Sequence, residues 1–406
     1  MRHFLKHMLM LGIAVSSLSM PALAADPITL TLWQVHPEWK GALQKILDRF
    51  ESENPGIKIQ VEQIPEQSYT AKMNTALGAG EGADIILVRP GPELRTAGES
   101  GYVIDLTGKV DTSNFTAAGL DAAQIDGKIY AMPVLGSYIV ALFYNKDIFA
   151  ANNLTPPKSA RELMKVCEVL KEKGIPTFVA PSQDGNNPGF MYMLSVASLL
   201  GQDGIDAIRK GDRKFTDPDV VKAARFMQDL YPCFDEGALS ETHVEGKAQF
   251  ALGKGAMMEG GSADYAGYLE TNPKINLGVI PFPALDGGKA ATVQGMESNL
   301  AVNAKSKNPE AAIKFLNWLA GNEASQMVVD NIALSTNKNV SPANNPVMQE
   351  MVEASKVNNA RVWYELPEVG NVYSAVGTNA QQLYLKELSP EDFSAVLQAA
   401  VDTKAK

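Results

Sequence analysis

The sequence is poor in the residues on which metal and redox chemistry depend. Its 406 residues include two cysteines and four histidines, and only His36 and His243 lie beyond the first ten residues. Two histidines are too few for a zinc cluster. Neither a Walker sequence nor a Gly-x-Ser-x-Gly elbow occurs. These absences argue against zinc enzymes, P-loop nucleotide enzymes and serine hydrolases with this elbow, and no cofactor is expected.

Long hydrophobic runs and blocks of like charge are missing as well. No stretch approaches the roughly 18 to 20 apolar residues that a membrane-spanning helix needs, so stable membrane insertion is not expected. Acidic residues outnumber basic residues by 46 to 36, which gives a formal net charge of −10. A protein of this charge does not neutralise phosphate groups. Neither nucleic acid nor an anionic membrane surface is therefore expected as a partner.

The N-terminus predicts a secretory signal peptide over residues 1–24. Basic residues at positions 2 and 6 precede a short apolar core at 8–15, and Ala22-Leu23-Ala24 has the small-x-small pattern that signal peptidase recognises. Cleavage after Ala24 would leave Ala25 as the first residue, where a lipid anchor would require a cysteine. We therefore expect a periplasmic protein without a lipid anchor.

Cys167 and Cys233 are the two cysteines. In the oxidising periplasm a disulfide between them would stabilise the fold by about 4 kcal/mol through the loop that it closes. The alternative is a pair of buried thiols that act as small hydrophobic side chains. The sequence leaves both alternatives open.

Short apolar strands alternate with amphipathic helices along the chain. Residues 28–33 alternate between apolar and polar, which predicts a strand, and residues 40–53 carry apolar side chains at helical spacing. Further strands are predicted at 57–64 and 84–88, and a second set of elements begins near residue 139. This alternation predicts an α/β fold with mainly parallel sheets. Because the chain exceeds the size that one core usually organises, two lobes are expected.

Six segments occur in an order that resembles one known family. They are Asp84-Ile-Ile86, Gly127-Lys-Ile-Tyr-Ala-Met-Pro133, Phe143-Tyr-Asn-Lys-Asp-Ile-Phe149, Gly255-Ala-Met-Met-Glu-Gly-Gly-Ser262, Pro281-Phe-Pro283 and Lys307-Asn-Pro-Glu-Ala-Ala-Ile-Lys-Phe-Leu316. Behind a signal peptide, they resemble the extracellular solute-binding proteins (family 1) of carbohydrate ABC importers, which include maltose-binding protein. The segments are spread along the mature chain, so the resemblance covers nearly all of it.

The resemblance implies two lobes of the periplasmic-binding-protein fold, each a mainly parallel sheet flanked by helices, with a hinge that the chain crosses three times. The N-terminal lobe would comprise residues 25–137 and 298–335, and the C-terminal lobe residues 138–297 and 336–406. The resemblance also implies a monomeric component of an ABC importer that captures a small sugar, glycoside or polyol by lobe closure. The importer's permease subunits would be its protein partners.

Sugar recognition requires polar groups for the hydroxyls and aromatic faces for the apolar faces of the rings. The loop after the first strand offers His36, Glu38 and Trp39, and the resemblance places ligand contacts there. Arg89 follows a buried strand and could donate paired hydrogen bonds to vicinal hydroxyls. Tyr138 stands where the family has an acidic ligand residue. The alternatives are a solvated loop for His36, a salt bridge for Arg89 and core packing for Tyr138.

The second half of the chain adds candidates of the same kinds. They come from a polar loop at 182–187 and the aromatic residues after it, from the turn after Gly260-Gly261, from a predicted hinge crossing and from the C-terminal region. In chain order they are Asp184, Asn187, Phe190, Ser262, Asp264, Tyr265, Glu297, Trp363 and Tyr373. Many family members have a tryptophan after this turn where this chain has Ala263. A ligand must therefore stack on another aromatic side chain.

Two other functions remain open on the sequence alone. A binder of a polar non-sugar, such as a glycerol phosphodiester or a polyamine, would have the same fold. Arg89 favours an anion, whereas the acidic candidates favour a neutral or cationic ligand. A carboxylate pair such as Glu38 and Glu297 could also serve a glycoside-acting enzyme. The missing enzyme motifs argue against catalysis, and no catalytic residue is assigned.

Overall fold

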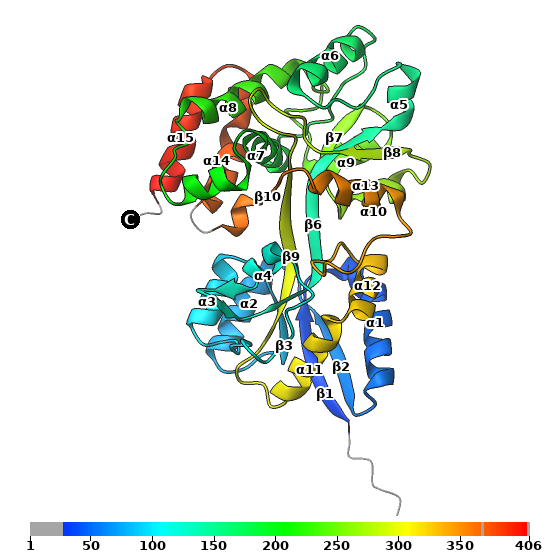
Figure 1. The fold of residues 1–406 in the computed structure, drawn as a ribbon, viewed down its shortest axis with the longest axis vertical. Coiled ribbons are helices and arrows are strands. Elements are labelled where there is room, and N and C mark those ends of the chain that lie inside the picture. Colours follow the sequence, from blue (N-terminus) through cyan, green and yellow to red (C-terminus); the bar gives the residue numbers. More distant parts are fainter. Residues whose placement is uncertain (1–26, 367–368, 404–406) are drawn as a thin grey trace, which may run out of the picture.

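The computed structural model of the protein describes residues 27–366 and 369–403, which form two lobes joined by extended segments (Figure 1). The predicted signal peptide lies outside the described residues. The elements of the first lobe are β1 (Ile28–Gln34), η1 (Pro37–Trp39), α1 (Lys40–Glu53), β2 (Ile57–Gln63), α2 (Glu66–Gly78), β3 (Ile85–Val88), α3 (Pro92–Glu99), α4 (Ala117–Asp121), β4 (Gln124–Ile125), β5 (Lys128–Ile129), α11 (Pro309–Leu319) and α12 (Asn322–Asn331).

Two long strands, β6 (Met132–Asn145) and β9 (Thr292–Val302), continue from one lobe into the other (Figure 1). The elements of the second lobe are α5 (Lys146–Ala151), α6 (Ala160–Lys171), α7 (Asn186–Arg209), α8 (Pro218–Leu230), η2 (Tyr231–Cys233), α9 (His243–Ala251), β7 (Met257–Gly261), α10 (Asp264–Thr271), β8 (Leu277–Ile280), α13 (Pro346–Ser355), β10 (Asn359–Arg361), η3 (Trp363–Glu365), α14 (Gly370–Tyr384) and α15 (Pro390–Asp402). The predicted α/β class with two lobes is confirmed.

The helix and strand patterns of the sequence account for the first lobe. In α1, Leu43, Ile46, Leu47 and Phe50 recur at helical spacing, and all four are buried. The helix ends at Glu53, because the proline and glycine that follow at 55–56 do not continue a helix. Strand β3 has four apolar residues that are all buried, as a strand covered on both faces requires.

The strands of both lobes form one mixed sheet in the order β2-β1-β3-β9-β6-β7, with β10 paired to β9 and β8 paired to β6. Strand β1 is parallel to β2 and to β3, and β10 is parallel to β9. The pairings of β9 with β3 and of β6 with β7, β8 and β9 are antiparallel. The sheet of the second lobe therefore differs from the expected mainly parallel arrangement, because its central strand β6 runs against three neighbours.

Each lobe has a hydrophobic core of its own, and β6 contributes to both. Val134 packs in the core of the first lobe. Further along the strand, Tyr138 and Val140 face one apolar cluster of the second lobe, while Ile139 and Ala141 face another on the opposite side of the sheet. This alternation is what a strand covered on both faces produces.

The chain passes between the lobes a third time in the segment that joins α12 to α13. The backbone N–H of Ser137 donates to the carbonyl of Leu334 over 2.7 Å, so this segment lies beside β6. Among the residues that the structure describes, no helix has both the length and the apolar character of a membrane span.

A disulfide joins Cys167 in α6 to Cys233 in η2, with a Cα–Cα distance of 5.5 Å. Both cysteines are buried. The bond links residues 66 positions apart, so it closes a long loop in the unfolded chain. The structure thereby decides between the two alternatives that the sequence left open.

Loss of this disulfide is expected to destabilise the protein. Replacing both cysteines by alanine should lower the free energy of unfolding by about 4 kcal/mol, because the unfolded chain regains the entropy of the open loop. Urea unfolding of the oxidised, reduced and Cys167→Ala/Cys233→Ala proteins measures the effect. Equal unfolding midpoints for the oxidised and reduced proteins would contradict it.

Candidate functional site

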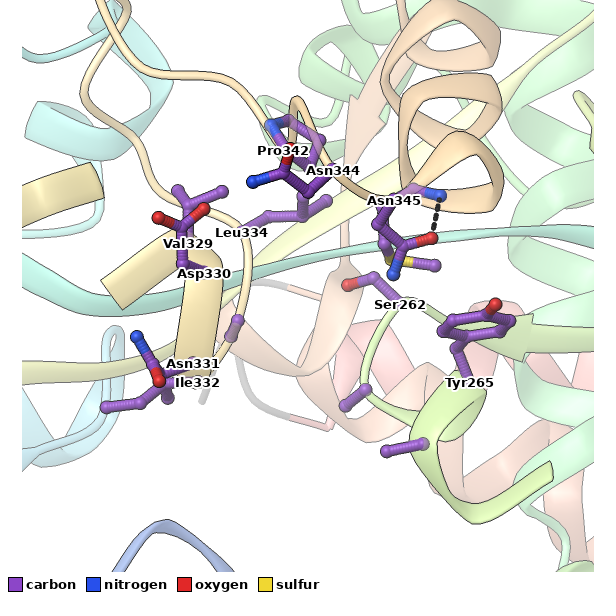
Figure 2. Close-up of a pocket in the computed structure, with 14 residues that line it drawn as sticks. Ser262, Tyr265, Val329, Asp330, Asn331, Ile332, Leu334, Pro342, Asn344 and Asn345 are labelled. Atoms are coloured by element: carbon purple, nitrogen blue, oxygen red, sulfur yellow. Dashed lines mark hydrogen bonds between the residues drawn. The ribbon is translucent and has the colours of Figure 1, made fainter. Parts of the chain in front are cut away.

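Several cavities are lined by residues from both lobes. Two of them hold residues that the sequence predicts as ligand contacts. The larger of these two, of about 380 Å³, lies between the β7–α10 turn and the end of α12. Figure 2 shows Ser262 and Tyr265 on one side of it and Asp330 and Asn331 on the other. The side chains of Asn344 and Asn345, which precede α13, add two amides, while Ile332 and Leu334 contribute apolar surface.

The smaller cavity, of about 290 Å³, lies beside the connecting strands. The first lobe contributes the loop after β3 and the start of α3, the connecting strands contribute one residue each, and the second lobe contributes the end of η3. The lining residues are Arg89, Pro90, Pro92, Glu93, Tyr138, Met296 and Glu365. Acidic, basic and phenolic groups therefore meet here within reach of one small molecule.

Tyr138 and Glu365 are tied together in this smaller cavity. The Tyr138 hydroxyl donates to Glu365 Oε1 over 3.5 Å, and the backbone N–H of Met296 donates to the same oxygen over 2.7 Å. Gly295, the partner of Tyr138 in the β6–β9 ladder, makes room for both side chains, because a Cβ atom there would overlap the tyrosine ring and the carboxylate. A glycine is therefore required at this point of β9.

Arg89 follows β3 directly, so the end of this strand places it at the cavity. Its backbone N–H donates to Glu93 Oε1 over 2.8 Å, and its Nη1 lies 3.3 Å from Glu93 Oε2. The guanidinium thus lines the cavity and at the same time belongs to an ion pair. The positive charge of Arg89 is compensated within the first lobe.

The loop after β1 brings His36 and Trp39 together. Their rings stack with centroids 3.8 Å apart, and His36 Nε2 lies 3.2 Å from the Ser298 hydroxyl of β9. Trp39 is 7% exposed and packs in the core of the first lobe. His36 therefore has the more open position of the two. The side chains of two further candidates, Glu38 and Glu297, lie outside what the structure describes.

The acidic candidates of the second lobe hold backbone groups at helix starts. The Asp184 carboxylate accepts from the N–H of Asn186 over 3.1 Å and from that of His243 over 2.8 Å. The Asp264 carboxylate accepts from Lys247 Nζ over 2.9 Å and from the N–H of Gly261 over 2.8 Å. Both carboxylates thus hold backbone groups of the second lobe, and neither is among the residues that line the two cavities.

The aromatic candidates lie in different surroundings. Tyr373 is partly buried, donates to Asn186 Oδ1 over 2.7 Å and meets Phe190 edge to face at 5.5 Å. Burial raises the pKa of the Tyr373 phenol and, to a smaller extent, that of Tyr265, which lines the larger cavity. Trp363 is 1% exposed among core aromatics. Trp363 therefore packs in the core of the second lobe and is not among the residues that line the two cavities.

Ser262 and Asn187 are buried more deeply than a simple contact surface requires. The Ser262 hydroxyl accepts from the N–H of Ile139 over 3.3 Å and borders the larger cavity. Asn187 is 1% exposed and donates to Glu259 Oε1 over 2.9 Å. Burial raises the pKa of the Glu259 carboxyl well above its ordinary value, and the nearby Asp264 carboxylate adds to the rise.

Sequence reasoning missed Glu365, Met296 and Glu259. Glu365 follows two aromatic residues in a short 3-10 turn, and no local pattern marks it as a cavity residue. Met296 stands next to the predicted Glu297, in a strand that the resemblance placed at the hinge. Glu259 lies inside a quoted family segment, and its position between apolar and glycine residues was the available signal.

The lobes also touch where α4 meets β10. Arg361 on β10 forms an ion pair with Asp121 on α4, so this pair spans the two lobes. Arg361 Nη2 also lies 3.6 Å from Glu365 Oε2. Gly91, with a φ of 79°, packs against the backbone of Glu365, which a Cβ atom would overlap. The described conformation thus has the lobes in contact on this side.

Known proteins resemble this arrangement over most of the chain. The model of the bacterial extracellular solute-binding protein family matches residues 35–326. The chain is 25% identical to the multiple sugar-binding protein of Streptococcus mutans over 316 residues, which covers 75% of this chain and 74% of that protein. It is 25% identical to the galactooligosaccharide-binding protein of Bacillus subtilis over 400 residues, which covers 92% and 88%.

A solved structure shares the fold. The solute-binding protein RafE in complex with raffinose matches with a TM-score of 0.76 at 19% identity, over 93% of this chain and 100% of that chain. The protein belongs to the bacterial extracellular solute-binding protein family. The family resemblance inferred from the sequence is thereby confirmed.

Removal of the ion pair between the lobes should favour a more open protein. Arg361→Gln removes the pair with Asp121, which forms only when the lobes approach, together with the longer contact to Glu365 within the second lobe. An ion pair with one half-exposed partner, as Asp121 is here, contributes up to about 1 kcal/mol, which corresponds to a roughly fivefold shift in the open-to-closed ratio. Small-angle scattering should therefore give a larger radius of gyration for Arg361→Gln without ligand.

The matched control is Arg225→Gln, which removes the ion pair with Glu391 inside the second lobe. It should leave the radius of gyration unchanged. An unchanged radius in Arg361→Gln, or an equal increase in the control, would show that the Asp121 pair does not hold the lobes together.

Proposed function

We propose that the protein is the periplasmic substrate-binding component of an ABC importer, and that it captures a small sugar, glycoside or polyol between its lobes. The observation that carries the proposal is the cavity beside β6 and β9. There Arg89 of the first lobe, Tyr138 of the connecting strand and Glu365 of the second lobe line one space. A ligand that contacts all three draws the lobes together.

The groups in this cavity suit a neutral, hydroxyl-rich ligand. Glu365 supplies acceptors, Arg89 supplies donors, and the Tyr138 hydroxyl does both. Because Arg89 is paired with Glu93 and the cavity holds a second acid, its charge does not favour a phosphodiester. The volumes of 290 and 380 Å³ lie at the small end of the range of about 300–1,000 Å³ for ligand pockets.

The relatives support the ligand class. Two are named for sugars or galactooligosaccharides, one is a binding protein for erythritol and L-threitol, and RafE holds raffinose. Sugars and polyols share arrays of hydroxyl groups, which the described cavities can bind. These relatives are binding proteins, and no catalytic role is proposed.

Secretion and transport follow from the same proposal. The signal peptide would be cleaved after Ala24, and the monomeric mature protein would deliver its ligand to the permease subunits. The lobes would comprise 25–137 with 298–335 and 138–297 with 336–406. Closure would turn about the strands β6 and β9 and the segment between α12 and α13.

Small ligands should bind better than long maltodextrins. Ala263 stands where many family members have a tryptophan, so a stacking platform is missing beside Ser262. Calorimetry should therefore show weak or no binding of maltotriose, whereas small glycosides or polyols such as erythritol should bind. Tight binding of maltotriose would mean that Tyr265 or another aromatic side chain replaces the platform.

Tyr138 should contribute directly to affinity. Tyr138→Ala removes a ring and a hydroxyl from the smaller cavity and should weaken ligand binding by at least about 1 kcal/mol, roughly fivefold. The control is Tyr231→Ala, in η2 near the disulfide. Calorimetry with the best ligand of the panel and far-UV circular dichroism measure the effect. Unfolding of Tyr138→Ala, or unchanged affinity, would favour a purely structural role.

A further inference from the structure

A group of buried polar side chains lies beneath the cavity wall of the second lobe. Asn187 at the start of α7, His243 at the start of α9 and Glu259 in β7 are 1%, 8% and 1% exposed. Asn187 Nδ2 donates to Glu259 Oε1 over 2.9 Å, and His243 Nδ1 lies 3.8 Å from the same oxygen. Three elements of the second lobe therefore converge on one carboxyl group.

One oxygen of the carboxyl group and the oxygen of the amide have no hydrogen-bond partner within the described residues. Glu259 Oε2 and Asn187 Oδ1 are both buried and both lack a donor. If Glu259 is ionised, each of these atoms is an acceptor only. A proton on Glu259 Oε2 supplies a donor, and the existing N–H bond already holds the amide and the carboxyl group together. The neutral acid and the amide can then form two parallel hydrogen bonds.

The surroundings favour the neutral acid. Burial is the main reason that the pKa of Glu259 is raised, and the Asp264 and Asp184 carboxylates raise it further, whereas the hydrogen bond from Asn187 and the charge of Lys247 lower it. Burial also lowers the pKa of His243, so this ring is not a strong source of positive charge. The remaining titratable groups near Glu259 are phenols on α10 and α14, namely Tyr268, Tyr373 and Tyr384.

We propose that Glu259, as the neutral acid, is a positioning residue that locks the start of α7 onto β7 through Asn187 and so shapes the ligand-binding wall. The two joined elements lead to further contacts in two directions. The neighbouring Asn186 accepts from Tyr373, which meets Phe190. On the other side, β7 leads into Ser262, which lines the larger cavity.

The inference rests on the proposed function for its effect on ligand binding and has a definite pH dependence. A carboxyl group whose pKa is raised by folding stabilises the native state fully below its unfolded pKa, and this stabilisation is lost as the pH rises through the folded pKa. Ionisation of Glu259 removes the donor for Asn187 and places a charge in the interior. The wall should loosen, and ligand affinity should fall, as the pH becomes alkaline.

Two substitutions at Glu259 distinguish a positioning role of its carboxyl group from a role in which the side chain only fills space. Glu259→Gln keeps the shape of the side chain and supplies a permanent N–H donor for Asn187. It should therefore retain the contact between α7 and β7 and abolish the loss of stability and affinity at alkaline pH. Glu259→Ala leaves the buried Asn187 amide unpaired and should weaken binding about tenfold. The control Glu172→Gln changes an exposed glutamate at the end of α6 and should leave both properties unchanged.

Three measurements test the inference on the full-length mature protein. Urea unfolding from acidic to alkaline pH measures how the free energy of unfolding depends on the protonation of Glu259. Hydrogen exchange of residues 184–190 measures how firmly the start of α7 is held. Calorimetry with raffinose, or with the best ligand of the panel, measures ligand affinity. Glu259→Gln should flatten the pH dependence of unfolding and preserve slow exchange, and Glu259→Ala should accelerate exchange.

The inference is overturned if Glu259→Gln loses protection as Glu259→Ala does, or if wild type and Glu259→Gln share one pH profile. Failure of every sugar and polyol to bind would overturn the proposed function instead, because the unfolding and exchange measurements require no ligand and still decide the role of Glu259.

Discussion

The pairing of β6 with β9 is the constraint on which the rest of the structure depends. Both strands belong to two cores, so the lobes cannot separate without breaking this ladder. The register that pairs Tyr138 with Gly295 also places Tyr138 and Met296 at the smaller cavity. The same hydrogen bonds therefore connect the lobes and build the floor of the site. A rotation about these strands changes the cavity while leaving both cores intact.

Outside the hinge, the described contacts between the lobes are few and polar. They include the ion pair of Arg361 with the half-exposed Asp121 and the approach of Gly91 to the backbone of Glu365. Such contacts contribute little free energy, so the ligand itself can decide the balance between open and closed forms. Stability resides elsewhere, in the two cores and in the disulfide between α6 and η2. This division allows the lobes to move while each remains rigid.

Sequence patterns predicted the parts of the molecule that depend on local periodicity. The buried face of α1, the short apolar β3 and the two-lobed plan follow from spacing, length and family resemblance. Arg89, Tyr138, Ser262 and Tyr265 do line the cavities, because their positions follow from strand ends and turns. Glu365 was overlooked and Trp363 packs in the core, since long-range packing of η3 against β9 decides which of them reaches the smaller cavity. Whether Cys167 reaches Cys233 likewise depends on distances that a sequence does not contain.

Lobe closure on a carbohydrate is the central claim, and an interlobe distance tests it most directly. Spin labels at Ser52→Cys in α1 and Lys171→Cys in α6 occupy exposed positions in different lobes, with the native disulfide retained. Double electron–electron resonance would be measured without ligand and with a saturating sugar or polyol that binds in calorimetry. The account predicts a shorter and narrower distance distribution with ligand. Identical distance distributions with and without saturating ligand would contradict lobe closure and would indicate that the protein binds its ligand without moving its lobes.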